Sequence, residues 1–312
     1  MIEKGKIVTI KQAVDMIPSG SHISIGGFSN QLLPMAIVRE IIRQKKDNFE
    51  LSSMGEGWAG DMLIGAGCLK KLRLSCFLIE GYGRCYNFVR AVENKEIEIE
   101  DYSHFGITLR FYAGALGIPF IPSRVMIGSD IHKIKSFDRD ALKIIKSPFT
   151  GEKILLIAPL KPDIAIIHAS RADKYGNIQL FGSEMIIDEI ARAAKKVIVS
   201  VEEIVCDEEI RKHPKYTIIP SFLVDAIIKI PFGAHPSGVY KYYDYDDKHI
   251  NYYIKSSKNK DDFKKYLNEF IYETRDHFDY LEKIGIKKLM ELRSDPTLGF
   301  SLANRRDIYE YE

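Results

Sequence analysis

Short apolar runs that end in glycine-bearing loops recur along the first third of the chain. Three such runs, at residues 22–25, 49–54 and 72–79, are each followed by glycines and then by apolar residues at helical spacing. Strands that alternate with helices build a parallel sheet, and ligands bind such sheets outside the carboxyl ends of the strands. The pattern therefore predicts an open α/β fold whose ligand edge is formed by these three loops.

The helix expected at residues 33–44 has the clearest amphipathic pattern. Ile37 and Ile41 fall on one face of this helix, whereas Arg39 and Glu40 fall on the other. We therefore expect the isoleucines to lie in the core and the charged side chains to lie in solvent. Further along, residues 94–101 read as a charged connector without a strand.

The predicted sheet resumes after a more polar stretch at residues 123–150. Further apolar runs predict strands at residues 154–158, 164–168, 196–201 and 226–230.

Beyond Ser237 the sequence becomes rich in tyrosine and charge, and residues 261–283 have the pattern of one long amphipathic helix. We expect an α/β domain at residues 1–238. Residues 239–312 are expected to form a C-terminal helical extension that packs on the core or on a partner.

Composition excludes several classes of protein but does not indicate which reaction the chain catalyses. The 312 residues carry 45 Lys and Arg against 43 Asp and Glu, a net charge of +2 that gives no basis for a nucleic-acid or membrane surface. No apolar run approaches the roughly 18 residues of a membrane span, and residues 1–10 lack a signal-peptide core. The four cysteines include no C-x-x-C pair. We therefore expect reduced thiols, no metal site and a cytoplasmic location.

The most informative stretch is residues 21–34, SHISIGGFSNQLLP. Gly26 and Gly27 stand where a strand passes into a helix, and glycine adopts positive φ at little cost. Main-chain N–H groups in such a turn can be approached by an oxygen that becomes anionic during a reaction. This pattern makes Gly26 and Gly27 candidates for an oxyanion turn. A tight strand-to-helix turn that binds nothing is the alternative, since Gly-Gly alone is a weak signal.

Three segments together resemble the A-type (alpha) subunit of family I coenzyme A transferases. They are Gly26-Gly27-Phe28 with Pro34, HASRADKYGN at residues 168–177, and PFGAHPS at residues 231–237. Within that family the glutaconate-type A subunits are the most similar. The resemblance implies an open parallel-sheet α/β sandwich and a ping-pong transfer of coenzyme A between an acyl-CoA and a carboxylic acid. It implies coenzyme A thioesters as substrates rather than a permanently bound cofactor.

The same resemblance implies that the chain supplies only half of the residues of an active site. In this family the nucleophilic glutamate lies on a B-type subunit, within a Ser-Glu-Asn-Gly or equivalent motif, and no Ser-Glu-Asn-Gly occurs here. The expected partner is therefore a B-type subunit in a heterodimer or heterotetramer. Phe28 and Ser29, next to the glycine turn, are then expected to bind substrate.

The segment at residues 168–177 corresponds to a family motif near the coenzyme A binding face. By this resemblance its polar and glycine residues are candidates for contact with coenzyme A: His168, Asp173, Gly176 and Asn177. A hairpin turn is the alternative, because Tyr-Gly-Asn supplies the residues that a turn needs.

Glu80 departs from the family pattern. As aligned, glutaconate-type subunits have a small hydroxyl residue before the glycine that corresponds to Gly81, suited to a substrate carboxylate. A glutamate repels a carboxylate unless it is protonated or paired with Arg84 or Arg90. Glu80 and Gly81 are thus candidates for substrate binding, and a solvated or arginine-paired loop glutamate is the alternative.

His104 aligns approximately with a catalytic glutamate in related hydrolases that open rings in steroid degradation. It is a candidate substrate-binding or acid–base residue, and an ordinary histidine at a helix start is the alternative. Two other functions therefore remain open. One is a coenzyme A thioester hydrolase or ring-opening enzyme on the same scaffold, and the other is a non-catalytic ligand-binding subunit.

Overall fold

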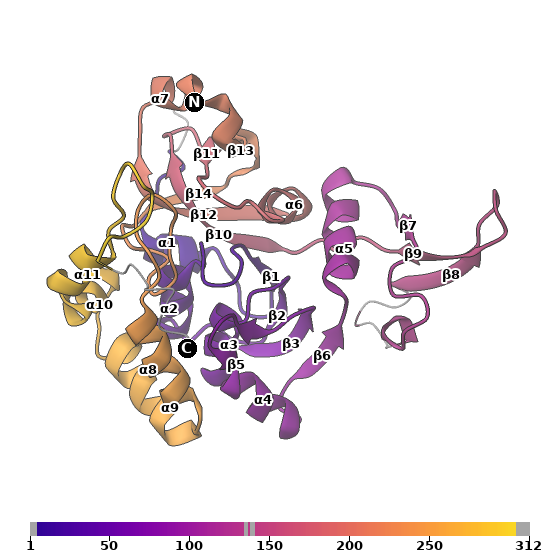
Figure 1. Cartoon of the computed structure of the whole chain (residues 1–312), viewed down its shortest axis with the longest axis horizontal. Helices are drawn as coiled ribbons and strands as arrows, with labels where there is room; N and C mark the ends of the chain where they lie inside the picture. Colours follow the sequence, from indigo (N-terminus) through magenta and orange to yellow (C-terminus); the bar gives the residue numbers. More distant parts are fainter. Residues whose placement is uncertain (1–4, 134–136, 138–140, 304–312) are drawn as a thin grey trace, which may run out of the picture.

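The computed structural model describes residues 5–133, 137 and 141–303, and it contains a large parallel sheet (Figure 1). Strands in the order β14-β12-β10-β1-β2-β3-β6 all pair in parallel. The predicted open parallel α/β sheet is confirmed. Its strands are β1 His22–Ile25, β2 Phe49–Ser52, β3 Leu69–Leu74, β6 Glu98–Asp101, β10 Ile164–Ala172, β12 Lys196–Ile204 and β14 Ala226–Lys229.

A short antiparallel extension lengthens this sheet beyond the end of β10. There β11 (Ile178–Gln179) pairs with β10, and β13 (Thr217–Ile219) pairs with β11. The α-helices are α1 Ile10–Asp15, α2 Met35–Arg43, α3 Trp58–Gly65, α4 Tyr86–Glu93, α5 His104–Leu116, α6 Ile187–Ala193, α7 Asp207–Lys212, α8 Asp247–Ser257, α9 Lys260–Leu267, α10 His277–Ile284 and α11 Ile286–Leu292.

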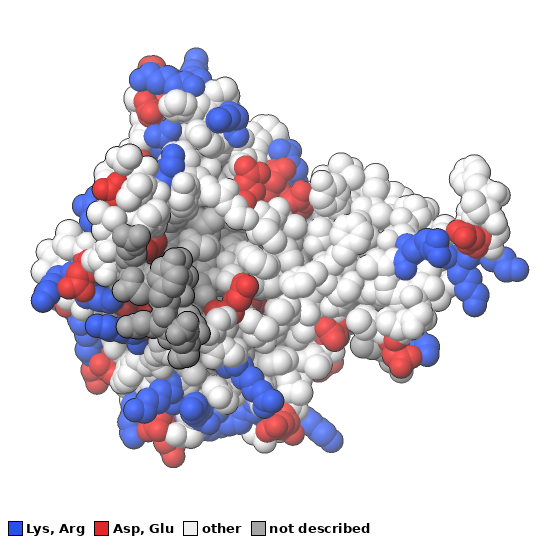
Figure 2. Space-filling model, in the orientation of Figure 1, with Lys and Arg blue, Asp and Glu red and all other residues white. Residues whose placement is uncertain are grey.

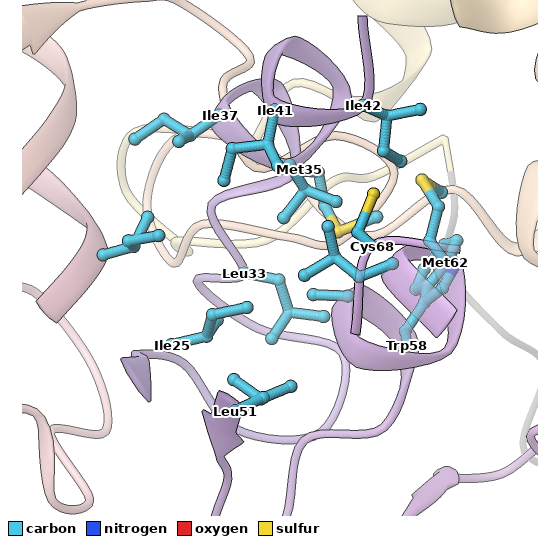
Figure 3. Close-up of a cluster of buried hydrophobic side chains, with 14 of the residues drawn as sticks. Ile25, Leu33, Met35, Ile37, Ile41, Ile42, Leu51, Trp58, Met62 and Cys68 are labelled. Carbon is cyan, nitrogen blue, oxygen red and sulfur yellow. The ribbon is translucent and has the colours of Figure 1, made fainter. Parts of the chain in front are cut away.

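The two faces of the sheet carry separate cores because alternate residues of a strand point to opposite faces. On β10, Ile164 and Ile166 join one buried cluster, whereas Ala165 and Ile167 join the other. Figure 3 shows the first cluster, in which side chains of α2 and α3 gather over β1 and β2. Helices α5 and α6 pack on the opposite face.

Three details of the predicted sheet are wrong. The run at 72–79 is not one strand: β3 ends at Leu74, and Leu78–Ile79 (β4) forms a separate hairpin with Gly83–Arg84 (β5). The supposed connector at 94–101 contains the edge strand β6, whose alternation was obscured by its charges. The run at 154–158 forms β9 of a second sheet instead of the main one.

That second sheet, which we call the arm, extends away from the body of the molecule (Figure 1). It is antiparallel, with the order β7-β9-β8, and consists of Ile121–Ser123, Lys153–Ile157 and Leu142–Lys146 respectively. The arm follows α5 and precedes β10, so the chain leaves the main sheet and then returns to its centre.

The outer face of α2 is covered by the C-terminal helices, so the prediction of solvent-exposed Arg39 and Glu40 is wrong. Both side chains are buried, and Arg39 donates to the carbonyl of His235 at 2.9 Å. The cause is the extension, because its Tyr280 and Ile271 belong to the same core cluster as α2. The single helix predicted at 261–283 is also wrong: α9 passes into a π-helical turn at Asn268–Tyr272, and α10 begins at His277.

Residues 304–312 of the predicted extension lie outside the described residues. Within the described ranges, no helix has the length and apolar content that a membrane crossing requires.

Candidate functional site

The glycine turn begins where β1 ends. The N–H of Gly26 donates to the carbonyl of Ile166 at 2.9 Å, which continues the pairing of β1 with β10. Gly27 has a φ of +100°, and a Cβ at this position would lie 2.7 Å from the carbonyl oxygen of Leu32. The conformation therefore requires glycine at position 27. Because the N–H of Gly26 is used in the sheet, Gly27 is the better candidate for an oxyanion donor.

Hydrogen bonds fix the loop after Gly27 almost residue by residue. The N–H of Phe28 donates to Gln31 O, and the N–H of Gln31 donates back to Phe28 O. The other bonds run from Ser29 N–H to Gly55 O, from Leu32 N–H to Gly238 O and from Leu33 N–H to Ser237 Oγ. Across residues 5–133, 137 and 141–303, no acceptor contacts the N–H of Gly27 or Asn30. Two main-chain N–H groups thus lack an acceptor in an otherwise saturated loop, and of these Asn30 is buried whereas Gly27 is partly exposed.

The backbone of this loop is also strained. Ser29 and Leu32 have φ values of 56° and 60°, a region that non-glycine residues enter at a cost of about 1–3 kcal/mol. The surrounding hydrogen bonds over-determine this conformation, and such strain clusters at ligand sites. No sequence pattern indicates it.

His104 lies beside the glycine turn. Its ring is 6.4 Å from that of Phe28, and its Nδ1 is 3.1 Å from Ser75 Oγ. A Cβ on Gly55 would lie 2.3 Å from Phe28 and 3.0 Å from His104, so the missing side chain at position 55 permits this contact. The structure therefore brings together the loops after β1 and β2, the residue after β3, and the start of α5.

Glu80 reaches the same region on the β4–β5 hairpin rather than on a strand of the main sheet. Its carbonyl accepts from Asn30 Nδ2 at 2.9 Å, and its side chain is exposed at the hairpin tip with Gly81. Arg90 instead donates to the carbonyl of Ser257 at 2.9 Å. No ion pair joins Glu80 to Arg84 or Arg90 in the described part of the chain.

Glu56 is a buried carboxyl group that sequence reasoning missed. Its Oε1 accepts from the N–H of Gly60 at 2.9 Å, and within the described ranges its Oε2 has no hydrogen-bond partner. Burial, with Asp61 nearby, raises the pKa of Glu56 to about 7. The signal in the sequence was a glutamate between two glycines at the end of a buried strand.

The residues predicted to contact coenzyme A have structural partners. His168 is buried, with Nδ1 2.8 Å from Ser200 Oγ and Nε2 2.9 Å from Glu202 Oε1. Asp173 Oδ1 accepts from the N–H groups of Tyr175, Gly176 and Asn177, as the hairpin-turn alternative requires. Asp173 also lies seven residues beyond Ile166, and Ile166 pairs with Ile25 at the end of β1. Asp173 is therefore about 20 Å along the strand direction from the start of the glycine turn.

The assembled site offers two unpaired peptide donors, an aromatic ring, a hydroxyl–imidazole pair and an exposed carboxylate. Such a set can hold a carbonyl oxygen that gains negative charge. Among the described residues, no group of three His, Cys, Asp or Glu side chains is arranged to hold a metal ion.

Comparisons with known proteins agree with this geometry. The coenzyme A transferase family profile matches residues 7–229. The chain is 37% identical to the A subunit of glutaconate CoA-transferase from Acidaminococcus fermentans, over 95% of this chain and 97% of that protein. It is 33% identical to the A subunit of 3-oxoadipate CoA-transferase from Pseudomonas knackmussii, over 90% and 98% respectively. The crystal structure of glutaconate coenzyme A-transferase from A. fermentans superposes with a TM-score of 0.90 and 36% identity, covering 95% of this chain and 98% of that one.

Proposed function

The chain belongs to the coenzyme A transferase family as an A-type member of its family I, and from this premise we propose that it forms half of a heteromeric CoA-transferase. The complete enzyme moves coenzyme A between an acyl-CoA and a carboxylic acid. The other half is a B-type subunit that carries the nucleophilic glutamate. Both relatives are named as one subunit of a larger enzyme, which supports such a partner.

The observation that carries this proposal is the Gly27 turn. Its N–H has no acceptor within the described chain, and it stands at the carboxyl edge of the parallel sheet beside Phe28. A thioester carbonyl placed against this N–H gains negative charge when a carboxylate attacks it. A preorganised donor at that position stabilises the transition state more than the ground state.

The proposed reaction then has two balanced halves. The partner's carboxylate adds to the thioester carbonyl, coenzyme A leaves as a thiolate, and an acyl-glutamyl anhydride remains. The thiolate attacks the glutamyl carbonyl of that anhydride, which releases the first carboxylic acid and leaves a glutamyl thioester. The acceptor acid reverses both steps. In this scheme the chain supplies Gly27 as the donor and Phe28, Ser29 and His104 as walls of the acyl pocket.

We expect the purified chain alone to be inactive and the complex with its B-type subunit to exchange labelled coenzyme A between thioesters. The reason is that the chain holds the donor turn but lacks the family's Ser-Glu-Asn-Gly motif. The measurement is carboxylate-dependent exchange, with the two proteins assayed separately and then together. Robust exchange by this chain without a partner would refute the proposal and direct attention to Glu80.

The same assay separates the other two functions. Loss of thioester that depends on water and not on an acceptor acid identifies a hydrolase, with His104 and Ser75 as the first residues to substitute. Binding of an acyl-CoA without turnover in the assembled complex identifies a non-catalytic subunit.

Glu80 provides a second test, directed at the substrate. If the hairpin tip borders the acyl pocket, its carboxylate disfavours acyl groups with a second free carboxylate, and we expect Glu80→Ser to raise kcat/KM for glutaryl-CoA relative to butyryl-CoA. Exposure limits the charge repulsion to about 1 kcal/mol, so the ratio should rise about five-fold. Glu282→Ser, at another exposed position on α10, is the control and should leave the ratio unchanged. A ratio unchanged in Glu80→Ser as well would remove Glu80 from the pocket.

A further inference from the structure

Helix α5 is apolar on two opposite sides. Ile107 and Phe111 are buried against the main sheet. Phe105, Tyr112 and Leu116 are 59%, 44% and 61% exposed, and their spacing of seven and four residues places them in one stripe. An isolated surface helix has one apolar face, so the second stripe on α5 needs a cover.

The exposed stripe continues onto neighbouring elements. Phe120 leads from α5 into the arm. On the arm itself, Ile144 is exposed on β8, and Phe149 near the tip is 94% exposed. We call these six side chains the α5–arm surface: Phe105, Tyr112, Leu116, Phe120, Ile144 and Phe149.

This surface carries few charges near α5. Figure 2 shows an expanse without Lys, Arg, Asp or Glu from the middle of the molecule across α5 to the base of the arm. The one charged residue of α5, Arg110, is buried and donates to Tyr102 Oη at 2.8 Å. Depletion of charge together with aromatic side chains is the compositional sign of an interface core.

The size of the surface fits a stable contact between subunits. At about 200 Å² for a fully exposed large side chain, the six residues leave roughly 700 Å² accessible. The largest apolar patch of a typical monomer is about 300–600 Å², and a standard interface buries about 800 Å² on each partner. The α5–arm surface alone supplies most of the latter area.

The position of the surface identifies the partner. His104 begins α5, contacts Phe28 and lies 3.1 Å from Ser75 Oγ, so the exposed stripe starts at the candidate site. A chain that covers Phe105 therefore stands beside the Gly27 turn. The proposed function requires a B-type subunit to bring a carboxylate to that place, whereas a second copy of this chain would not bring the family's nucleophile motif.

We propose that the α5–arm surface is the docking surface of the B-type subunit, with the start of α5 closing the active site against that partner. This inference rests on the proposed function and adds the surface through which it is assembled. Leu116 lies three turns along α5 from His104, so it tests docking without altering the groups placed at the site.

We expect Leu116→Arg to weaken binding of the cognate B-type subunit at least ten-fold. A charge in the centre of an apolar contact is desolvated without a partner. Ile286→Arg is the matched control, because Ile286 is 78% exposed on α11 and lies off the surface. The affinity between the two proteins is measured by sedimentation and by titrating activity with the B-type partner. At saturating partner, Leu116→Arg should recover wild-type kcat.

A measurement on the unaltered chain covers the case in which Leu116→Arg folds poorly. Binding of the B-type partner should slow amide hydrogen exchange in residues 104–116 and 142–157 and leave α11 unchanged. Wild-type affinity of folded Leu116→Arg, or no protection of these residues in the complex, would overturn the docking assignment. An assembled complex with protected α5 but no acyl exchange would instead overturn the proposed function and leave the docking surface standing.

Discussion

Replacing Gly27 with alanine should lower kcat of the assembled complex at least about 100-fold. A Cβ at this position would lie 2.7 Å from Leu32 O and 2.8 Å from Gln31 O, both backbone atoms that cannot rotate away. The positive φ of +100° adds strain for any side chain. The N–H of residue 27 must therefore shift, and loss of one oxyanion donor typically costs 10²–10³ in rate.

Gly20→Ala is the matched control for this substitution. Gly20 has a similar φ of +81°, and a Cβ there would have nothing within 4 Å. It should lose about 1 kcal/mol of stability and retain full kcat. Thermal unfolding and affinity for the B-type partner show whether Gly27→Ala is folded and assembled. Wild-type kcat in a folded, assembled Gly27→Ala complex would contradict the oxyanion assignment.

The features that sequence predicted correctly are those fixed by neighbouring residues. Strand β1 and the glycine turn follow from a short apolar run that meets Gly26 and Gly27. Helix α5 starts and ends where Ser103 and Gly117 indicate: Ser103 Oγ accepts from Gly106 N, and Gly117 adopts a φ of +68°.

The features that sequence missed depend on distant segments. The amphipathic pattern of α2 predicts that Arg39 is exposed to solvent, yet its guanidinium carbon lies 3.7 Å from the centroid of the Tyr280 ring. The sequence predicts Glu80 at the end of a main-sheet strand, whereas in the structure it lies at the tip of the β4–β5 hairpin. The residues around Glu80 do not distinguish a main-sheet strand from a hairpin. Glu56 is buried, and burial raises its pKa to about 7, which the two glycines beside it in the sequence do not reveal.

The contact between α2 and the C-terminal helices contains three buried histidines. His277 Nε2 donates to the carbonyl of Pro231 at 2.8 Å, and its Nδ1 accepts from Arg39 at 3.2 Å, so this ring is neutral. Burial also lowers the pKa of His235, and it lowers that of His249 to about 3. Each ring faces other groups across this contact: His235 faces Tyr280 and Asp246, and His249 faces Tyr266.

We expect the chain to lose stability steeply as the pH falls below about 6.5. The unfolded chain protonates its histidines near 6.5, whereas the folded chain keeps these three neutral, so protons favour unfolding below that pH. Each such histidine contributes up to about 1.4 kcal/mol per pH unit. His249 and His277, whose pKa values lie furthest below 6.5, together cost roughly 4 kcal/mol by about pH 5, which is a large part of the stability of an ordinary domain. His235 and the N–H of His249 hold the pKa of Asp246 below its usual range despite burial. Protonation of Asp246 at lower pH therefore also favours unfolding.

The measurement is the urea midpoint between pH 7.5 and pH 5 for the wild type, His277→Gln and His213→Gln. Glutamine at 277 can still donate to Pro231 and accept from Arg39 but does not titrate, so its pH slope should be shallower by about 1.4 kcal/mol per unit. His213 is exposed, and its substitution should keep the wild-type slope because folding does not remove this side chain from solvent. A urea midpoint that stays constant down to pH 5.5, or equal slopes for all three proteins, would show that the buried histidines do not make the stability of the chain depend on pH.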